Sequence, residues 1–137
     1  MNKLCFIGSG NMGYAMISGV VKSKLIDANK IFVSNKSEKK LNDLKEEWGV
    51  HTTTDNKKAC ENSDVVILAV KPHIIPLVLE EIKDNINKET IVISVAAGVT
   101  ISDIEKNTGT DRKILRVMPN TPCLVGEGMS AICPKKI

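Results

Sequence analysis

Residues 6–13 read FIGSGNMG, so three glycines spaced two and three residues apart follow directly on a short apolar run. Glycine inside a strand or helix costs about 0.5–1 kcal/mol relative to alanine, and three in eight residues need a reason. Residues 3–7 predict a β-strand, and residues 11–22 predict a helix. The expected apolar face of that helix holds Met12, Ala15, Met16, Gly19 and Val20.

The pattern Gly8-x-Gly10-x-x-Gly13 therefore lies in the turn from a strand into a helix, which is the context of a dinucleotide-binding site. The first glycine permits the tight turn, the second lets the main chain approach a pyrophosphate, and the third lets the helix pack on the strand. The phosphates would be held by the free N–H groups at residues 11–13 and by the positive end of the helix. The alternative is a turn with a purely structural role.

The rest of the chain alternates apolar strands with helical patterns. Further strands are expected at residues 30–34, 50–52, 64–70, 90–95, 113–118 and 128–132, and further helices at 38–48, 56–62, 72–83 and 101–108. Residues 64–70 (DVVILAV) form a continuous apolar run, as in a central parallel strand buried on both faces. We expect a single α/β domain over residues 1–137: a Rossmann-type, doubly wound, mostly parallel sheet with helices on both faces.

Composition narrows the function classes. The 137 residues are 42% apolar with a formal charge of only +3, which does not indicate nucleic-acid binding. No apolar run reaches the ~18 residues of a membrane span, and the N-terminus lacks the layout of a signal peptide. Four cysteines (Cys5, Cys60, Cys123, Cys133) show neither a C-x-x-C pair nor zinc spacing, so inert reduced thiols, a cytoplasmic location and no metal site are expected.

The residues at the end of the second predicted strand indicate which cofactor the chain binds. An NAD-binding unit usually has a carboxylate there for the ribose 2′-hydroxyl. This chain has Ser34, Asn35 and Lys36, with no carboxylate before Glu38. Neutral groups and one cation suit a 2′-phosphate, so NADP(H) is favoured, with NAD(H) left open. The alternative is that Lys36 is a solvated charge and Ser37 only a helix cap.

The carboxyl ends of three later strands should line the ligand crevice. They are residues 69–72 (AVKP), 96–98 (AAG) and 118–122 (MPNTP). Lys71 is interpreted as a catalytic acid, a cofactor contact or a surface charge. His73 is interpreted as a solvated first-turn histidine, and the alternative is a donor to a phosphate or to the substrate. The alternative for all three stretches is that they are simply turns.

Taken together, these stretches resemble the pyrroline-5-carboxylate reductase family. The resemblance rests on FIGSGNMGYAMISG (6–19), SNKS (34–37), DN (55–56), DVVILAVKP (64–72), ISVAAGVT (93–100) and above all RVMPNTPCLVGEGMSAIC (116–133). It implies an oxidoreductase that reduces a small cyclic imine, 1-pyrroline-5-carboxylate, to L-proline with NAD(P)H, the final step of proline biosynthesis. Family members are homo-oligomers, and they continue into a helical dimerisation domain that is absent from these 137 residues, so the chain alone is expected to turn over poorly.

The resemblance also implies site residues. Cofactor contacts fall on Ile7, Gly8, Ser9, Gly10, Asn11, Met12, Gly13, Ser34, Asn35, Lys36, Asn56, Ala69, Val70, Lys71, Pro72, Ala97 and Gly98. Substrate contacts fall on Met118, Pro119, Asn120 and Thr121. No catalytic side chain is expected, because hydride can add directly to a protonated imine and the cofactor carries that chemistry.

Three other interpretations remain open from the sequence. A β-hydroxyacid dehydrogenase has a similar nucleotide domain, although the MPNTP block argues against it. An NADP-linked oxidoreductase that uses another electron carrier could share the GNMG turn. A domain that binds a dinucleotide without catalysing any reaction is the third.

Overall fold

A computed structural model of the chain describes residues 2–109, 111–118 and 131–134. One seven-stranded sheet runs through it in the order β3-β2-β1-β4-β5-β6-β7. The strands are β1 (Leu4–Ile7), β2 (Ile31–Ser34), β3 (His51–Thr53), β4 (Val65–Leu68), β5 (Ile91–Ser94), β6 (Lys113–Met118) and β7 (Ala131–Pro134). The helices are α1 (Asn11–Lys22), α2 (Glu38–Trp48), α3 (Asn56–Cys60), α4 (Ile75–Ile82) and α5 (Ile101–Thr108), with short 3-10 turns at Ala28–Lys30 and Pro72–Ile74.

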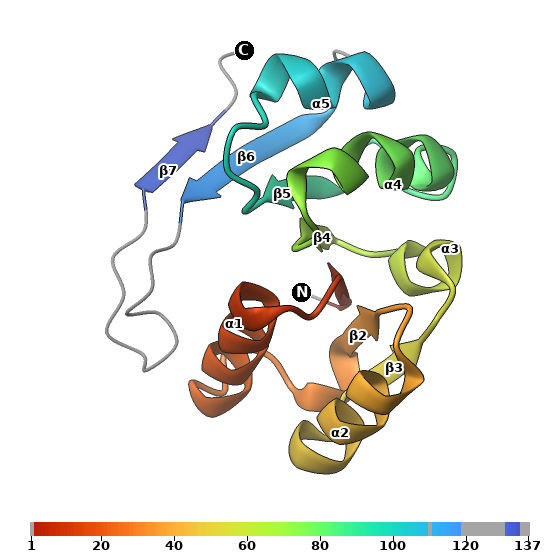
Figure 1. The fold of residues 1–137 in the computed structure, drawn as a ribbon, viewed down its shortest axis with the longest axis vertical. Coiled ribbons are helices and arrows are strands. Elements are labelled where there is room, and N and C mark those ends of the chain that lie inside the picture. The colour runs from red at the N-terminus through yellow and green to blue at the C-terminus, as the bar shows by residue number, and fades with distance from the viewer. Residues whose placement is uncertain (1, 110, 119–130, 135–137) are drawn as a thin grey trace.

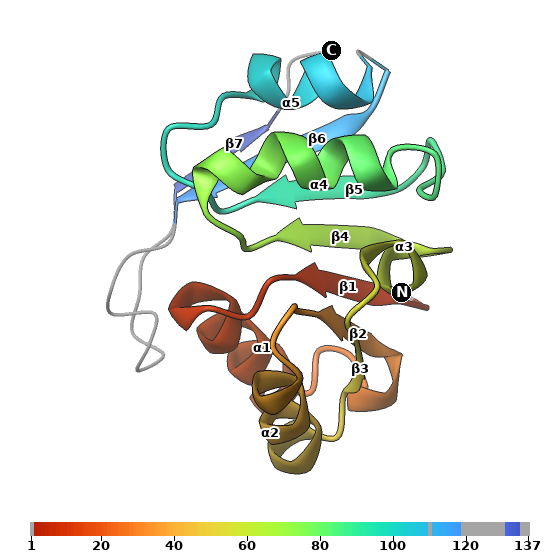
Figure 2. The same ribbon diagram turned by 45° about the vertical axis from the view of Figure 1, so that its right-hand side comes forward.

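The sheet order is that of the doubly wound dinucleotide-binding fold. Strands β1 to β6 pair in parallel, and β7 pairs antiparallel with β6. Figure 2 shows the arrows of β1, β4 and β5 pointing the same way. The chain leaves β1 toward β2 on one side and later enters β4 on the other, so the strand order reverses between β1 and β4. Ligands of this fold bind beyond the carboxyl ends of the strands at that reversal.

Helices cover both faces of the sheet, and each face has its own apolar core. Phe6 packs in a cluster with residues of α1 and α2, whereas its neighbour Ile7 packs in a cluster with residues of α3, α4 and α5. All four residues of β1 and of β4 are buried, as the continuous apolar pattern predicted for a central strand. Figure 1 shows α1 and α2 beside β1–β3, and α4 and α5 beside β4–β6.

Local signals set the helix ends. The Ser37 side chain accepts from the N–H of Lys40 at the start of α2, and Gly49 ends that helix in the left-handed region with φ 72°. Thr100 and Asp103 form a reciprocal capping box at the start of α5. These caps confirm the predicted starts and ends of both helices.

Some expectations differ from the structure in detail. The predicted helix over 72–83 divides into the 3-10 turn Pro72–Ile74 and α4, because Pro76 lacks an N–H and is accommodated in the first turn of α4. Gly19 is exposed, contrary to the predicted apolar face of α1, and the fully buried Ile17 anchors that helix instead. The strand expected at 128–132 is observed at Ala131–Pro134, with residues 128–130 outside the described part.

Two further findings bear on the molecule as a whole. Cys5 and Cys60 are buried free thiols, as expected, while Cys123 lies outside the described residues. Within the described ranges, no helix is long and apolar enough to cross a membrane.

Candidate functional site

The turn after β1 is shaped by Gly8, the first of the three glycines. Its φ of 94° lies in the region that side chains rarely adopt, and its N–H donates to the carbonyl of Ser34 at 2.8 Å. A Cβ atom on Gly8 would lie 2.6 Å from the carbonyl oxygen of Ala69 and 2.9 Å from Cγ1 of Val70. Gly8 thus lets the ends of β1, β2 and β4 come together.

The other two glycines have different surroundings. A Cβ on Gly13 would lie 3.0 Å from the Gly8 carbonyl oxygen and 3.2 Å from the Ala69 Cβ, so Gly13 permits close packing of α1 on the turn. A Cβ on Gly10 would meet nothing within 4 Å. Gly10 is the N-cap of α1, with no side-chain cap and no acidic residue in the first turn. Open space therefore faces a helix start whose N-cap residue, a glycine, has no side chain to cap it.

A crevice of about 390 Å³ lies at the carboxyl ends of β1, β2 and β4. It gathers eleven of the predicted cofactor residues: Ile7, Gly8, Ser9, Gly10, Ser34, Asn35, Lys36, Asn56, Ala69, Val70 and Lys71. Ile74 and Val78 also line it, and sequence reasoning did not select them. Their spacing on the predicted helix after the fourth strand was the signal that could have found them, since i and i+4 share a helix face.

A network of neutral side chains orders the polar end of this crevice. The hydroxyl of the buried Ser34 donates to Oδ1 of Asn56. The side chain of Asn35 donates to Oγ of Ser9 and accepts from the N–H of Ser37 at 3.0 Å. Three segments distant in sequence are thereby held together before any ligand binds. The arrangement offers neutral donors and acceptors, with the exposed Lys36 beside them.

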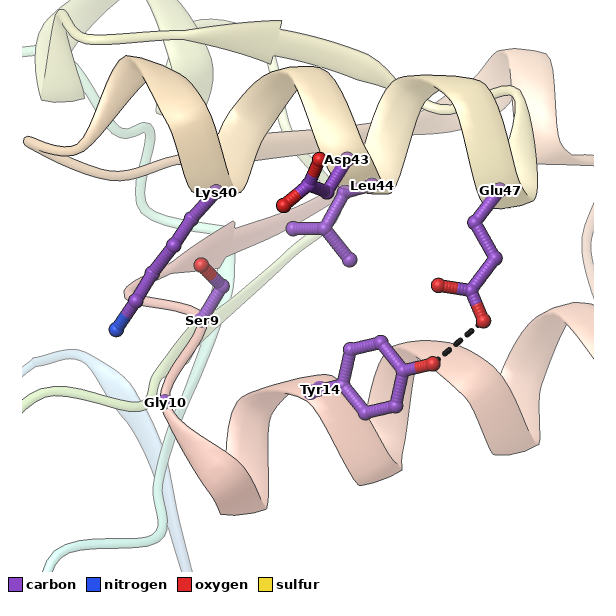
Figure 3. Close-up of a pocket in the computed structure, with 7 residues that line it drawn as sticks. All are labelled: Ser9, Gly10, Tyr14, Lys40, Asp43, Leu44 and Glu47. Carbon is purple, nitrogen blue, oxygen red and sulfur yellow. Dashed lines mark hydrogen bonds between the residues drawn. The ribbon is translucent and has the colours of Figure 1, made fainter.

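A second cavity, of about 310 Å³, opens between α1 and α2 (Figure 3). Ser9 and Gly10 line both cavities, so the two meet at the glycine turn. The remaining lining residues of the second cavity are Tyr14, Lys40, Asp43, Leu44 and Glu47, none of which sequence reasoning selected. Tyr14 donates to Oε1 of Glu47 at 2.5 Å, and this bond to a carboxylate raises the pKa of Tyr14.

Other predicted residues lie elsewhere. Asn11, Met12 and Gly13 form the first turn of α1. Pro72 and Gly98 line a separate cavity of about 400 Å³ between the start of α4 and α5, together with His73. Ala97 is exposed in the connection from β5 to α5. The structure thus places the predicted nicotinamide-side residues in more than one cavity.

The predicted substrate residues belong mostly to the part that is not described. Met118 is the last residue of β6, and Pro119, Asn120 and Thr121 lie outside the described residues. Their roles stay predictions. Among the side chains that the structure does describe, no group of three or more His, Cys, Asp or Glu could hold a metal ion.

Comparison with known proteins agrees with this geometry. Residues 3–98 match the family model described as NADP oxidoreductase coenzyme F420-dependent. The pyrroline-5-carboxylate reductase of Escherichia coli is 38% identical over 135 residues, which are 98% of this chain and 50% of that enzyme. The chain thus spans about half the length of the curated relatives it matches.

Solved structures give the same result. A pyrroline-5-carboxylate reductase from Coxiella burnetii superposes with a TM-score of 0.93 at 44% identity, over 98% of this chain and 50% of that one. The Plasmodium falciparum pyrroline carboxylate reductase with NADP bound superposes with a TM-score of 0.85 at 34% identity, over 98% of this chain and 48% of that one. The chain therefore belongs to the family of NADP oxidoreductases described as coenzyme F420-dependent, and it is similar along nearly its whole length to pyrroline-5-carboxylate reductases.

Proposed function

We propose that this chain is the nucleotide-binding domain of a pyrroline-5-carboxylate reductase and binds NADPH in the crevice at the ends of β1, β2 and β4. One observation carries the proposal: open space lies in front of Gly10, the N-cap of α1, which has no side chain to cap the helix. Unpaired N–H groups and the positive end of a 12-residue helix suit a pyrophosphate. The P. falciparum enzyme, which is similar over nearly the whole chain, holds NADP.

The crevice residues would divide the cofactor between them. The main chain at Gly10–Gly13 would hold the pyrophosphate. Ser34, Asn35 and Lys36 would surround the adenosine ribose and its 2′-phosphate, with Asn56 on the adenosine side. Val70 and Lys71 would flank the nicotinamide half, together with Pro72, Ala97 and Gly98. NAD(H) would bind more weakly, because the polar end has no carboxylate for a free 2′-hydroxyl.

The proposed reaction is the reduction of 1-pyrroline-5-carboxylate to L-proline, the final step of proline biosynthesis. When bound, NADPH supplies the hydride. This chain's residues would orient the nicotinamide half against the substrate, which Met118, Pro119, Asn120 and Thr121 would border. Positioning of this kind is worth several powers of ten in rate, and it requires no nucleophilic side chain.

We further propose a homo-oligomeric enzyme acting in the cytoplasm, with this domain as its cofactor-binding part. Support for the oligomer comes from the resemblance to the reductase family. Support for the compartment comes from the two buried free thiols, Cys5 and Cys60, since reduced cysteines are usual in the cytosol.

Calorimetric titration of the 137-residue chain with NADPH tests the binding proposal. In Gly10→Ser, the new hydroxyl would enter the open space and cap the N–H groups that the pyrophosphate needs. Folding should be preserved, because nothing lies within 4 Å of the new Cβ. We expect NADPH affinity to fall at least tenfold. Gly19→Ala is the matched control, because its Cβ also meets nothing within 4 Å and it lies in the last turn of α1, away from the glycine turn.

Failure of NADPH to bind the unaltered chain, or equal binding by Gly10→Ser, would contradict the proposal. Turnover is tested by following NADPH oxidation by the enzyme expressed from its complete reading frame. The alternative hydride acceptors are pyrroline-5-carboxylate, a 3-oxo acid and coenzyme F420. Activity with coenzyme F420 alone, or with the 3-oxo acid alone, would reassign the reaction. Binding without any of these activities would indicate a dinucleotide-binding protein that is not a reductase.

A further inference from the structure

A hydrogen bond joins the start of α1 to the last turn of α2. The hydroxyl of Tyr14 donates to Oε1 of Glu47 at 2.5 Å (Figure 3), and a bond from a hydroxyl to a carboxylate is stronger than one between neutral groups. Of the side chains that the structure describes, Tyr14 is the one that connects α1 to α2 by a hydrogen bond. Its N–H also donates to the carbonyl of Gly10 at 2.8 Å, which closes the first turn of α1. Tyr14 therefore links the main chain at the proposed pyrophosphate site to a second helix.

The first turn of α1 borders open space on two sides. Ser9 and Gly10 line the cavity between α1 and α2 and also the larger crevice. Gly13 packs this turn against the end of β1, but not against α2. Apolar packing between the two helices lies further from the glycine turn, where Ile17 shares a core cluster with Leu44. The side of the first turn that faces α2 is thus supported across a cavity, by polar contacts.

Two hydrogen bonds hold this region at separate points. Asn35 donates to Ser9 in the glycine turn, and Tyr14 donates to Glu47. The first bond fixes the turn before α1, and the second fixes the direction in which the helix leaves that turn. Figure 3 shows Glu47 at the end of the cavity away from Gly10, and a carboxylate repels a phosphate. An effect of Glu47 on a bound pyrophosphate would therefore pass through Tyr14.

We propose that Tyr14 is a positioning residue for the pyrophosphate of the bound dinucleotide. This inference rests on the proposed function. Through Glu47, Tyr14 would hold the start of α1 in the direction from which its free N–H groups meet the pyrophosphate, and hydrogen bonds weaken steeply when their angles change. NADPH and NADH carry the same pyrophosphate, so binding of both would depend equally on Tyr14. Adenosine 2′-monophosphate has no pyrophosphate, so its binding would not depend on Tyr14.

Calorimetric titration of the 137-residue chain with NADPH, NADH and adenosine 2′-monophosphate tests this inference. Tyr14→Phe removes the hydroxyl and keeps the ring, whose centroid lies 6.4 Å from that of the Trp48 ring. Glu47→Ala removes the acceptor, whereas Glu47→Gln keeps an acceptor oxygen. Glu46→Ala is the matched control, because Glu46 is exposed on the same helix, carries the same charge and lines neither cavity. Thermal unfolding of each variant sets a titration temperature at which all of them are folded.

We expect Tyr14→Phe and Glu47→Ala each to weaken NADPH and NADH binding about fivefold and to leave adenosine 2′-monophosphate binding unchanged. Glu47→Gln should retain most of the affinity, and Glu46→Ala should bind all three ligands as the unaltered chain does. A variant that combines Tyr14→Phe with Glu47→Ala should lose no more affinity than either change alone, because both remove the same bond.

The inference would be wrong if Tyr14→Phe bound NADPH as tightly as the unaltered chain, or if Glu46→Ala showed the same loss. An equal fall in adenosine 2′-monophosphate binding would overturn it too, since the change would then loosen the whole crevice. Additive losses in the combined variant would show that the two side chains act separately and would also overturn it. Failure of the unaltered chain to bind NADPH would instead overturn the proposed function.

Discussion

The carbonyl oxygen of Ala69 lies 2.6 Å from the position that a Cβ atom on Gly8 would occupy. Real Cβ atoms essentially never come so close to another heavy atom, and both partners belong to main chain that is fixed by the sheet. The N–H of Ala69 donates to the Ile7 carbonyl at 2.8 Å, which continues the pairing of β1 with β4 to this point. A glycine here is what lets the two strands end side by side and form one wall of the crevice.

Gly8→Ala should therefore destabilise the fold itself. The cost combines a backbone conformation at φ 94° that alanine rarely adopts with displacement of the β4 main chain, and we expect about 2–4 kcal/mol. Urea unfolding of the two proteins measures it. Gly19→Ala, on the exposed face of α1, should stabilise by about 0.5–1 kcal/mol. A Gly8→Ala protein as stable as the unaltered chain would contradict the steric account.

Asn35→Ala should loosen the polar end of the crevice. It removes the bond to Ser9 and leaves the N–H of Ser37 without its acceptor, at a cost of about 1–2 kcal/mol. NADPH binding should weaken as well, because the segments after β1 and β2 are no longer joined. Thermal unfolding with and without NADPH measures both effects. Asn42→Ala, an exposed asparagine of α2, is the control and should change stability by less than about 0.5 kcal/mol. Equal changes in stability and NADPH binding in the two variants would contradict the role of the Asn35 hydrogen bonds.

Asp64 should make the fold sensitive to acid. Its carboxylate accepts from the N–H of Asn2 at 2.6 Å and of Lys3 at 3.1 Å, and these bonds, the first most strongly, lower the pKa of Asp64. The folded state thus binds fewer protons than the unfolded chain, so this contribution to stability is present above the unfolded pKa and is lost as the pH falls through the folded pKa. Asp64→Asn should be less stable at pH 7 and lose less stability between about pH 5 and pH 2. Denaturant unfolding at several pH values in that range measures the free energy of unfolding. If this free energy changed equally with pH in both proteins, the account would be wrong.

Cys5 and Cys60 should be poor nucleophiles in the folded protein. Burial raises the pKa of the Cys60 thiol from 9.0 to about 11 and raises that of Cys5 as well. Since the thiolate is the reactive form, the Cys60 thiolate fraction at pH 8 falls about 100-fold, and steric protection adds to this. Peptide mass spectrometry after N-ethylmaleimide treatment should find both cysteines unmodified in the native protein and modified in urea. If Cys60 were labelled at the same rate in the native protein and in urea, its burial would not protect it, and this account would be wrong.

Much of the fold could be predicted from local signals. The strand at Lys113–Met118 and the helix at Asn11–Lys22 have the predicted bounds, and the caps at Ser37 and Thr100 are where the residue types indicated. The division of the predicted helix at Pro72–Ile74 was harder to predict from the sequence. A proline indicates that a regular helix is interrupted, but it does not indicate at which residue the next helix begins.

The candidate site divides in the same way. Gly8, Gly10 and Gly13 could be selected because a strand, a turn and a helix follow one another along the chain. The residues that line the cavity between α1 and α2 could not, because that cavity exists only once both helices pack on one face of the sheet. Pro72 and Gly98 line a cavity apart from the crevice, since the direction in which a loop leaves its strand is set by packing, and their cofactor contacts stay predictions.

By itself the sequence determined the elements, their caps and the glycine turn, because apolar period, capping groups and backbone freedom act between residues a few positions apart. Only the tertiary structure decided that Asn35 reaches Ser9, 26 residues earlier, and that Gly10 faces open space while Gly8 and Gly13 do not. Those relations depend on the distances between strands paired in the order β2-β1-β4, and neighbours in a sheet are chosen by the burial of both its faces and not by adjacency along the chain.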